Sequence, residues 1–368
     1  MSKVNIIKNA MVVDVTNGTS AKRTLYIRDG KFVDATEETG AAVIDVEGCY
    51  AAPGFVDSHV HVFVNHAAIF IEADTVGVQQ GVLTVVDAGS TGIRDFPYFE
   101  KEVIQAKETD VRFFLNIARS GLCDGQNELS NMDDLMTVEE LLKFKHLHGR
   151  QLVGLKVRMS SSVVQESGIK PLIYARELSD QVGLPLMIHI GNAPPGLDEI
   201  LNLLKKGDIV THCFHGKPGG ISDYPEEFRS AVQRGVHFDL GHGAASFSSK
   251  AMLRVREIGF VDFSISTDLY GENYITPVGS LMDTMSKLLA MGYTVEDLTR
   301  RVTALPRSFL NLPAAKIETG QPADLTLFRI VEKPRELVDA EGVRIPVDRY
   351  FYPAASIKQG RQVWHNEL

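Results

Sequence analysis

The stretch PGFVDSHVH at residues 53–61 decides the fold and most of the chemistry that this sequence predicts. Its apolar start favours a buried β-strand, and His59 and His61 follow two residues apart. Side chains at that spacing on a strand lie on the same side, so both imidazoles converge on one point. Neutral imidazole is a common metal ligand. The pair therefore predicts half of a divalent metal site, although an isolated pair is also compatible with surface histidines at a strand end.

Further ligand-type residues lie at the C-terminal ends of other short apolar runs. They are Lys156 in run 152–159, His189 in run 185–190, His212 in run 208–214 and Asp268 after run 263–267. Each of these residues, taken alone, is compatible with a hydrogen-bonded structural role. Five separate strand ends that each carry such a residue are difficult to explain by structure alone. The set indicates a shared metal centre.

Strands and helices alternate from residue 53 onward. Strands are predicted at 53–61, 81–87, 112–117, 152–159, 185–190, 208–214, 236–240 and 263–267, with amphipathic segments such as 94–107, 138–148 and 171–182 between them. Alternating β and α units favour a parallel sheet, and eight strands predict an α/β fold of the closed (β/α)8 TIM barrel type. Such barrels carry their active sites at the C-terminal ends of the strands, which is where the ligand-type residues lie.

Both ends of the chain have β character. Before residue 53, short apolar runs are separated by turn signals such as Asp29-Gly30, and strand character returns at 323–328, 353–357 and 362–364. Neither end is long enough for a stable domain by itself. We therefore expect one small β-sandwich built from both ends, with residues 1–52 as its first part, 53–312 as the TIM barrel and 313–368 as its second part.

The composition of the 368 residues, 44% hydrophobic and 23% charged, is typical of a soluble globular enzyme. A net charge of −9 without a Lys/Arg-rich stripe argues against nucleic-acid binding. No apolar run approaches the ~20 residues of a membrane span, and the N-terminus lacks a signal-peptide core. Cys49, Cys123 and Cys213 are scattered. We expect a reduced, cytoplasmic enzyme that acts on a small molecule, and a homo-oligomer is compatible with the sequence.

The motif at residues 53–61 and the later Lys, His, His and Asp resemble the amidohydrolase superfamily of binuclear metallohydrolases, over essentially the whole chain. The segment GQPADLTLF at 320–328 is similar to the returning sandwich segment of dihydroorotase-, hydantoinase- and deacetylase-like members. The segments GLKVR at 154–158 and GHGAASF at 241–247 resemble the amidohydrolase/deacetylase branch, which is dihydroorotase-like. The substrate-binding signature of dihydroorotase itself is not matched.

This resemblance implies a site with two divalent metal ions. Zn²⁺ suits the donor set best, and Mn²⁺, Co²⁺ and Fe²⁺ are alternatives. By motif, His59, His61 and Asp268 would hold the more buried ion, His189 and His212 the more exposed ion, and Lys156, carboxylated by CO2, would bridge them. A neutral lysine amine can take up CO2, whereas a protonated lysine would be repelled by two cations. A salt-bridged lysine at the barrel mouth is the alternative.

The resemblance also implies hydrolysis by metal-activated hydroxide, with Asp268 as the catalytic group that transfers the proton. The expected substrate is a small carboxylate-bearing molecule, an N-acyl amino acid or an O-acyl hydroxy acid, whose amide or ester bond is cleaved. Cyclic amide hydrolysis, as in dihydroorotase or hydantoinase, is the alternative. A deaminase is less favoured because the related deaminases mostly use one metal ion, and retained ligands argue against an inactive scaffold.

Two residues are predicted to bind the substrate. Arg158 lies on the same side of its strand as Lys156, and its planar guanidinium matches a carboxylate. A pair with a neighbouring acidic loop, or support of the Lys156 carbamate, is equally compatible with this position. His242 follows the seventh predicted strand and is expected to contact the substrate. Whether His66 or His215 does so stays open.

Overall fold

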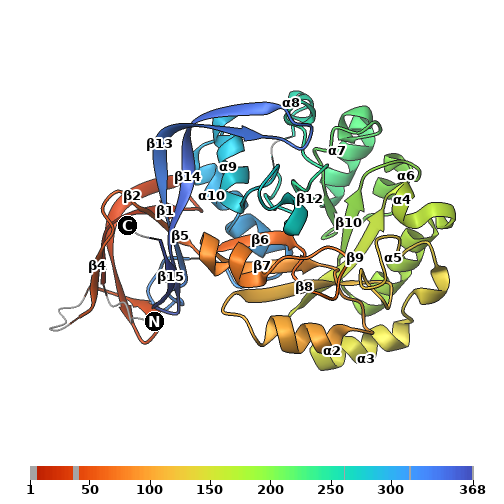
Figure 1. Ribbon diagram of the computed structural model, residues 1–368, viewed down its shortest axis with the longest axis horizontal. Coiled ribbons are helices and arrows are strands. Elements are labelled where there is room, and N and C mark those ends of the chain that lie inside the picture. Colours follow the sequence, from red (N-terminus) through yellow and green to blue (C-terminus); the bar gives the residue numbers. More distant parts are fainter. Residues whose placement is uncertain (1–5, 36–40, 261, 315, 367–368) are drawn as a thin grey trace.

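Figure 1 shows the computed structural model, which describes residues 6–35, 41–260, 262–314 and 316–366. A sheet of parallel strands surrounded by helices lies on the right of this view, and strands from both chain ends lie together on the left. The fold is mixed α/β, as the alternation of strands and helices predicts.

Seven parallel strands of the described chain form the central sheet, and each pairs with its neighbours in sequence order. They are β6 (Phe55–Val60), β7 (Val82–Ala88), β8 (Asp110–Asn116), β9 (Leu152–Met159), β10 (Leu186–Ile190), β11 (Ile209–Thr211) and β12 (His237–Asp239). Most of their residues are buried, because helices cover one side and the packed interior lies on the other. All seven correspond in place to predicted strands.

The eighth predicted strand, at residues 263–267, is not a regular strand, but it closes the sheet. On one side, Ser264 accepts a hydrogen bond from the backbone of Leu240 at 2.9 Å. On the other side, the backbone N–H of Asp268 donates to His59 at 2.7 Å, and that of His61 donates to Leu269 at 3.0 Å. The segment therefore lies between β12 and β6, and the sheet is closed in the manner of a TIM barrel.

The described helices surround this sheet or follow it in the chain. They are α1 (Ala73–Val76), α2 (Phe96–Phe99), α3 (Val138–His148), α4 (Ser161–Val164), α5 (Lys170–Val182), α6 (Leu197–Asn202), α7 (Pro225–Arg234), α8 (Ser249–Glu257), α9 (Leu281–Ala290), α10 (Val295–Arg301) and α11 (Ala304–Phe309). The helix predicted at 94–107 is shorter than expected and passes into a π-helical turn at Glu100–Ile104. In the described chain, no helix combines the length and apolar composition that crossing a bilayer requires.

The strands of both chain ends join in one eight-stranded sheet of the described residues. They are β1 (Ile6–Asp14), β2 (Thr19–Arg28), β3 (Lys31–Val33), β4 (Val43–Asp45), β5 (Tyr50–Pro53), β13 (Leu325–Val338), β14 (Arg344–Lys358) and β15 (Arg361–His365). The link is β5, which pairs with β1 on one side and β13 on the other. A separate apolar core packs against this sheet. The division of this eight-stranded sheet into the two layers of a sandwich stays a prediction. The domain boundaries after residues 52 and 312 also stay predictions.

The hairpin of β13 and β14 is much longer than the sequence indicates. It crosses above α9 and α10 and reaches α8 (Figure 1). At its tip, the backbone N–H of Ala340 donates to Phe247 at 2.9 Å, and Ser248 donates its hydroxyl to Glu341 at 2.6 Å. The tip thus contacts the loop that follows β12, at the C-terminal end of the barrel strands.

Asp239, at the end of β12, holds the closed sheet together from inside. Its buried carboxylate accepts four hydroxyl hydrogen bonds, from Ser58 at 3.2 Å, Thr211 at 2.8 Å, Ser264 at 2.6 Å and Ser266 at 2.5 Å. These donors come from β6, from β11 and from the closing segment. Burial raises the pKa of Asp239, and the four hydroxyl donors oppose that rise.

We expect Asp239→Ala to lower the free energy of unfolding by about 3 kcal/mol or more, because four buried hydroxyls lose a charged acceptor. Urea denaturation measures this change. The matched control is Asp348→Ala, at an exposed position, which should change stability by no more than about 0.5 kcal/mol. Equal stability of the two variants would contradict the role given to Asp239.

Candidate metal centre

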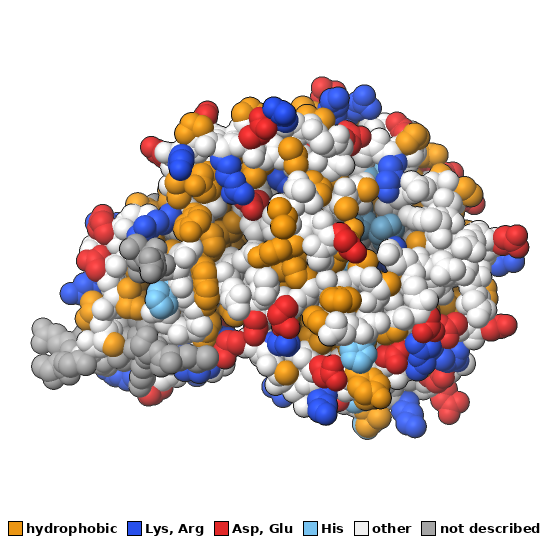
Figure 2. Space-filling model, in the orientation of Figure 1, with side chains coloured by type: hydrophobic (Ala, Val, Ile, Leu, Met, Phe, Trp, Pro, Cys, Tyr) orange, Lys and Arg blue, Asp and Glu red, His pale blue; other side chains and the backbone are white. Residues whose placement is uncertain are grey.

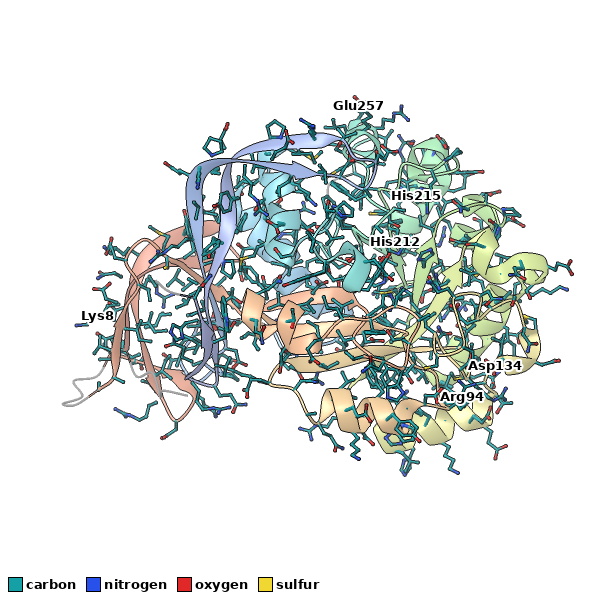
Figure 3. The ribbon with its side chains drawn as sticks, viewed as in Figure 1. Lys8, Arg94, Asp134, His212, His215 and Glu257 are labelled. Atoms are coloured by element: carbon teal, nitrogen blue, oxygen red, sulfur yellow. The ribbon has the colours of Figure 1, made fainter. Side chains whose placement is uncertain are left out.

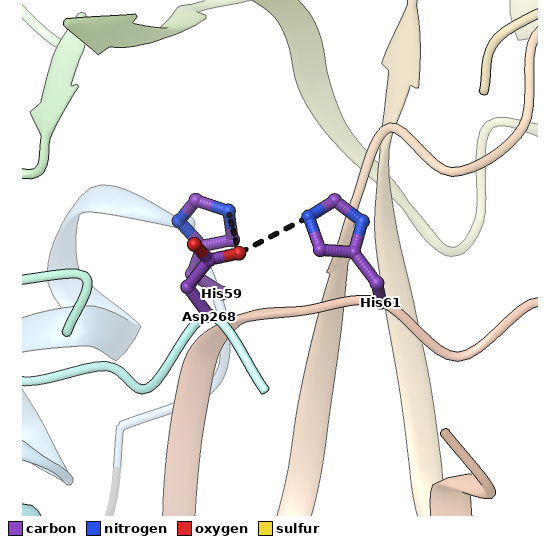
Figure 4. A group of neighbouring side chains, drawn as sticks. All are labelled: His59, His61 and Asp268. Carbon is purple, nitrogen blue, oxygen red and sulfur yellow. Dashed lines mark ion pairs between the residues drawn. The ribbon is translucent and has the colours of Figure 1, made fainter. Parts of the chain in front are cut away.

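His59, His61 and Asp268 form a cluster at the C-terminal end of the barrel strands (Figure 4). The Nε2 atoms of His59 and His61 lie 3.3 Å and 3.2 Å from Oδ1 of Asp268. One ligand atom of each residue lies within 4.8 Å of the other two. The histidines come from the end of β6 and Asp268 from the closing segment, so closure of the sheet assembles the cluster.

A chain of hydrogen bonds fixes the tautomer of His59. Thr211 donates its hydroxyl proton to Asp239 at 2.8 Å, so it accepts from Nδ1–H of His59 at 2.9 Å. Nε2 of His59 then carries a lone pair that faces the carboxylate of Asp268. Two acceptors that face each other at 3.3 Å repel unless a cation lies between them. The pair therefore fits a divalent metal ion.

His212 points a second lone pair at the same carboxylate. Its Nδ1 lies 2.7 Å from the carbonyl of Gly241, which only accepts, so the proton is on Nδ1. Nε2 is buried, has no hydrogen-bond partner among the described residues, and lies 3.9 Å from Oδ2 of Asp268. Burial lowers the pKa of His212 to about 3, although the Asp268 carboxylate opposes that shift, so the ring is neutral. An unpartnered buried nitrogen of this kind fits a metal ligand.

The backbone at two of the predicted ligand positions is unusual. His212 has φ of 67° and Asp268 has φ of 52°, in the left-handed region that residues other than glycine seldom adopt. Such conformations cost free energy and persist at functional sites, where surrounding structure enforces them. In both cases the turn directs the side chain toward the centre of the barrel mouth.

Lys156 and His189 complete the predicted set. Lys156, on β9, is 1% exposed, and its Nζ lies 3.2 Å from Nε2 of His59. Burial lowers the pKa of this lysine to about 7. The ring of His189, on β10, lies 4.4 Å from the ring of His212, and its Nε2 lies 3.1 Å from the hydroxyl of Ser160. The structure thus brings all six predicted ligand residues together, and their donor types fit divalent metal ions.

Arg158 forms an ion pair with Glu128, at 3.1 Å, from the loop that follows β8. The Glu128 side chain is 1% exposed, so the two charges neutralise each other in a largely buried setting. The structure therefore contains one of the two alternative interactions predicted for Arg158, the ion pair with a neighbouring acidic loop. A contact with substrate stays a prediction that involves its other N–H groups.

Both ring nitrogens of His242 have partners within the protein. The residue is 0% exposed, its Nδ1 lies 2.9 Å from the carbonyl of Gly243, and its Nε2 lies 2.8 Å from Nζ of Lys287. Because both ring nitrogens are engaged, this arrangement argues against the expected contact between His242 and substrate. Lys287 lies on α9, far along the chain, so no local sequence signal links the two residues.

His66 and His215, for which a contact with substrate stayed open, lie in different surroundings. His66 pairs with Glu102 at 3.1 Å and stacks on Phe63 with ring centroids 4.4 Å apart. His215 lies close to His212 in the same loop (Figure 3) and is 4% exposed. Cys213, between them, packs into the apolar core, and burial raises the pKa of its thiol well above the ordinary value, which argues against a nucleophilic role.

Three hydroxyl groups contact the histidines of the candidate centre, and they were not predicted from the sequence. Thr211 contacts His59, Ser160 contacts His189, and Ser90 contacts Nδ1 of His61 at 2.9 Å. Partners of this kind fix the ring orientation of metal-binding histidines. A hydroxyl near a strand end carries no distinctive sequence pattern, so only the fold identifies them.

Comparison with known proteins agrees with this geometry. A model of the amidohydrolase family matches residues 50–343. A deacetylase of Enterococcus faecalis is 35% identical over 373 residues, which cover 98% of this chain and 94% of that protein.

Solved structures are similar over the whole chain. One described as a dihydroorotase has a TM-score of 0.92 and 32% identity, covering 98% of this chain and 97% of that one. Another, described as an adenine deaminase, has a TM-score of 0.90 and 34% identity, covering 99% of this chain and 100% of that one. These two descriptions name different activities. The chain is therefore a hydrolase that belongs to the amidohydrolase family.

Proposed function

We propose that this chain hydrolyses the amide or ester bond of small acylated molecules that carry a carboxylate, such as N-acyl amino acids or O-acyl hydroxy acids. The observation that carries the proposal is the cluster of two buried histidines, His59 and His61, with Asp268, and the amine of Lys156 3.2 Å from His59. The similarity to a deacetylase over nearly the whole chain supports acyl transfer to water as the reaction.

Two divalent metal ions, of which Zn²⁺ suits the donors best, would complete the site. His59, His61 and Asp268 would hold the more buried ion, and His189 and His212 the other. Lys156 would lie between them as a carbamate. Its lowered pKa, about 7, supports this role, because a substantial fraction of the amine is neutral at neutral pH and free to react with CO2.

When bound, the metal ions would lower the pKa of a water molecule and polarise the scissile carbonyl. Asp268 accepts the proton of the attacking water and passes it to the leaving amine or alkoxide. Burial acts to raise the pKa of Asp268, but the hydrogen bond with His61 and nearby positive charge outweigh it, so the pKa lies below its ordinary value. The carboxylate is therefore ionised before the reaction, as a proton acceptor must be.

Cyclic amide hydrolysis is the second candidate, since one similar structure is described as a dihydroorotase. A hydrolysis screen of N-acyl amino acids, O-acyl hydroxy acids and cyclic ureides separates the two functions. Metal analysis of the same preparation should find about two ions per chain. Cleavage of cyclic ureides alone would favour the second candidate, and a metal-free, inactive protein would contradict both.

Lys156→Ala removes the proposed carbamate. We expect loss of bound metal and of activity, because the remaining ligands then lack a bridging carboxylate. Short carboxylic acids added to the assay should partly restore activity by occupying the vacated space. A structure of the wild-type enzyme with both ions bound and a bare ammonium at Lys156 would show the assignment to be wrong.

Asp268→Asn separates metal binding from proton transfer. The amide keeps an oxygen ligand but cannot accept a proton, so kcat should fall by about 100-fold or more while much of the metal is retained. Metal content and turnover are measured on one preparation. Turnover close to that of the wild type would exclude Asp268 as the proton acceptor.

Arg158→Lys tests whether Arg158 reads the substrate. If its free N–H groups bind a carboxylate, kcat/KM for acidic substrates should drop by about 10- to 100-fold, with a much smaller change for neutral activated esters. Glu128→Gln is the companion variant, since it removes only the charge of the partner. Equal losses on both substrate types, with intact metal content, would assign Arg158 to support of the site through Glu128.

A further inference from the structure

Lys287 and His242 form a buried pair that the proposed chemistry does not use. Lys287 lies on α9 and His242 in the loop after β12, and both residues are fully buried. Figure 2 shows histidine side chains in a hollow of this face, in the region where Figure 3 labels His212. Because the pair lies beneath the surface, its effect on the candidate centre must pass through other residues of the chain.

The hydrogen bonds of the pair fix the tautomer of His242. Its Nδ1 lies 2.9 Å from the carbonyl of Gly243, which only accepts, so the ring proton is on Nδ1. Nε2 therefore accepts from Nζ of Lys287, at 2.8 Å. Lys287 also donates to the carbonyls of Pro277 at 2.5 Å and Val278 at 3.3 Å. The amine is thus held by three acceptors, and His242 links it to the backbone of Gly243.

The backbone of Gly243 packs directly on the carboxylate of Asp268. A Cβ atom at Gly243 would lie 2.6 Å from Oδ2 of Asp268, and φ at this glycine is 53°. The other carboxylate oxygen, Oδ1, faces Nε2 of His59 at 3.3 Å and Nε2 of His61 at 3.2 Å. Contact on the Oδ2 side limits how far the carboxylate can turn away from these histidines. The position of Gly243 therefore affects the geometry of the proposed proton acceptor.

The same loop also contacts His212. The carbonyl of Gly241 accepts a hydrogen bond from Nδ1 of His212 at 2.7 Å, and a Cβ atom at Gly241 would lie 2.8 Å from that nitrogen. This contact orients the ring whose Nε2 has no partner among the described residues. Residues 241–243 thus touch two of the predicted ligand residues, and the side chain of His242 connects this segment to α9.

This segment needs a side-chain anchor, because a glycine lies on each side of His242. Glycine restricts the backbone less than any other residue does. The backbone N–H of His242 donates to Ser266 at 3.1 Å, and that of Gly243 donates to Thr267 at 2.9 Å. Both of these bonds lead to the segment that closes the barrel, whereas the bond with Lys287 leads to α9. The pair therefore restrains the loop from a second element of the fold.

We propose that the Lys287–His242 pair positions residues 241–243 and, through them, the proton acceptor and one ligand of the candidate centre. These two groups are Asp268 and His212. The inference rests on the proposed function, since it concerns residues of the same site. Neither member of the pair touches a metal ion or the substrate, and both are positioning residues. His242, expected from the sequence to contact the substrate, is assigned instead to support of the site.

The first test measures Co²⁺ binding to the metal-free protein by visible absorption, so it does not require turnover. We expect His242→Leu and Lys287→Met to weaken Co²⁺ binding by about 10-fold or more, because the ligands are then less firmly oriented. The double variant should bind Co²⁺ no more weakly than either single variant, since the two residues act as a unit. His242→Gln keeps an acceptor and a donor and should recover most of the affinity.

Ser286→Ala is the matched control for a general loss of stability on α9. Ser286 is buried next to Lys287, but its hydroxyl donates to Met282 at 2.6 Å and accepts the backbone N–H of Phe351 at 2.9 Å. This variant should lower the melting temperature without weakening Co²⁺ binding. If Lys287→Met does not fold, the comparison of His242→Leu with His242→Gln decides the same question.

In the metal-loaded enzyme, kcat of His242→Leu and Lys287→Met should fall by about 10- to 100-fold with little change in KM, because neither residue touches the substrate. Unchanged Co²⁺ affinity, additive losses in the double variant, no recovery in His242→Gln, an equal loss in Ser286→Ala, or a rise in KM alone would overturn the proposal. If the wild type binds Co²⁺ but hydrolyses none of the compounds screened, the binding comparison stands and only the proposed hydrolysis fails. A wild type that binds no Co²⁺ would contradict both.

Discussion

The rest of the structure depends on the hydrogen bonds that the buried carboxylate of Asp239 accepts. This carboxylate accepts hydroxyl hydrogen bonds from two strands and from the segment that closes the barrel, and one of those hydroxyls, of Thr211, orients His59. The same hydrogen-bond network therefore closes the sheet and orients the ring of His59. A buried polar network is stable only when each of its groups has a hydrogen-bond partner. The hydrogen bonds that stabilise the closed barrel therefore also fix the geometry of the candidate centre.

The centre itself concentrates groups that repel one another. The lone pairs of His59 and His212 face the carboxylate of Asp268 at 3.3 Å and 3.9 Å, and the amine of Lys156 is buried beside them. A folded chain holds such groups together because strand ends converge and surrounding packing fixes them. Divalent cations and a carbamate would convert these repulsions into attractions, which is the physical basis for assigning hydrolytic chemistry to this end of the barrel.

The second sheet contributes to the site although it lies outside the barrel. The hairpin of β13 and β14 extends from it to the loops after β11 and β12, where Glu341 packs on Gly216 and binds Ser248. These loops border the candidate metal centre. The tip of this hairpin thereby connects the second sheet to the barrel mouth.

The sequence by itself determined the alternation of strands and helices, seven of the barrel strands and the six ligand-type residues, because these depend on local periodicity and on residue chemistry at strand ends. Only the tertiary structure decided how the closing segment pairs, how far the β13–β14 hairpin extends, and which partners Arg158 and His242 have. Glu128 and Lys287 lie 30 and 45 residues from these side chains in the chain. Contacts over such separations arise from packing of whole elements, and they leave no periodic trace in the sequence around either residue.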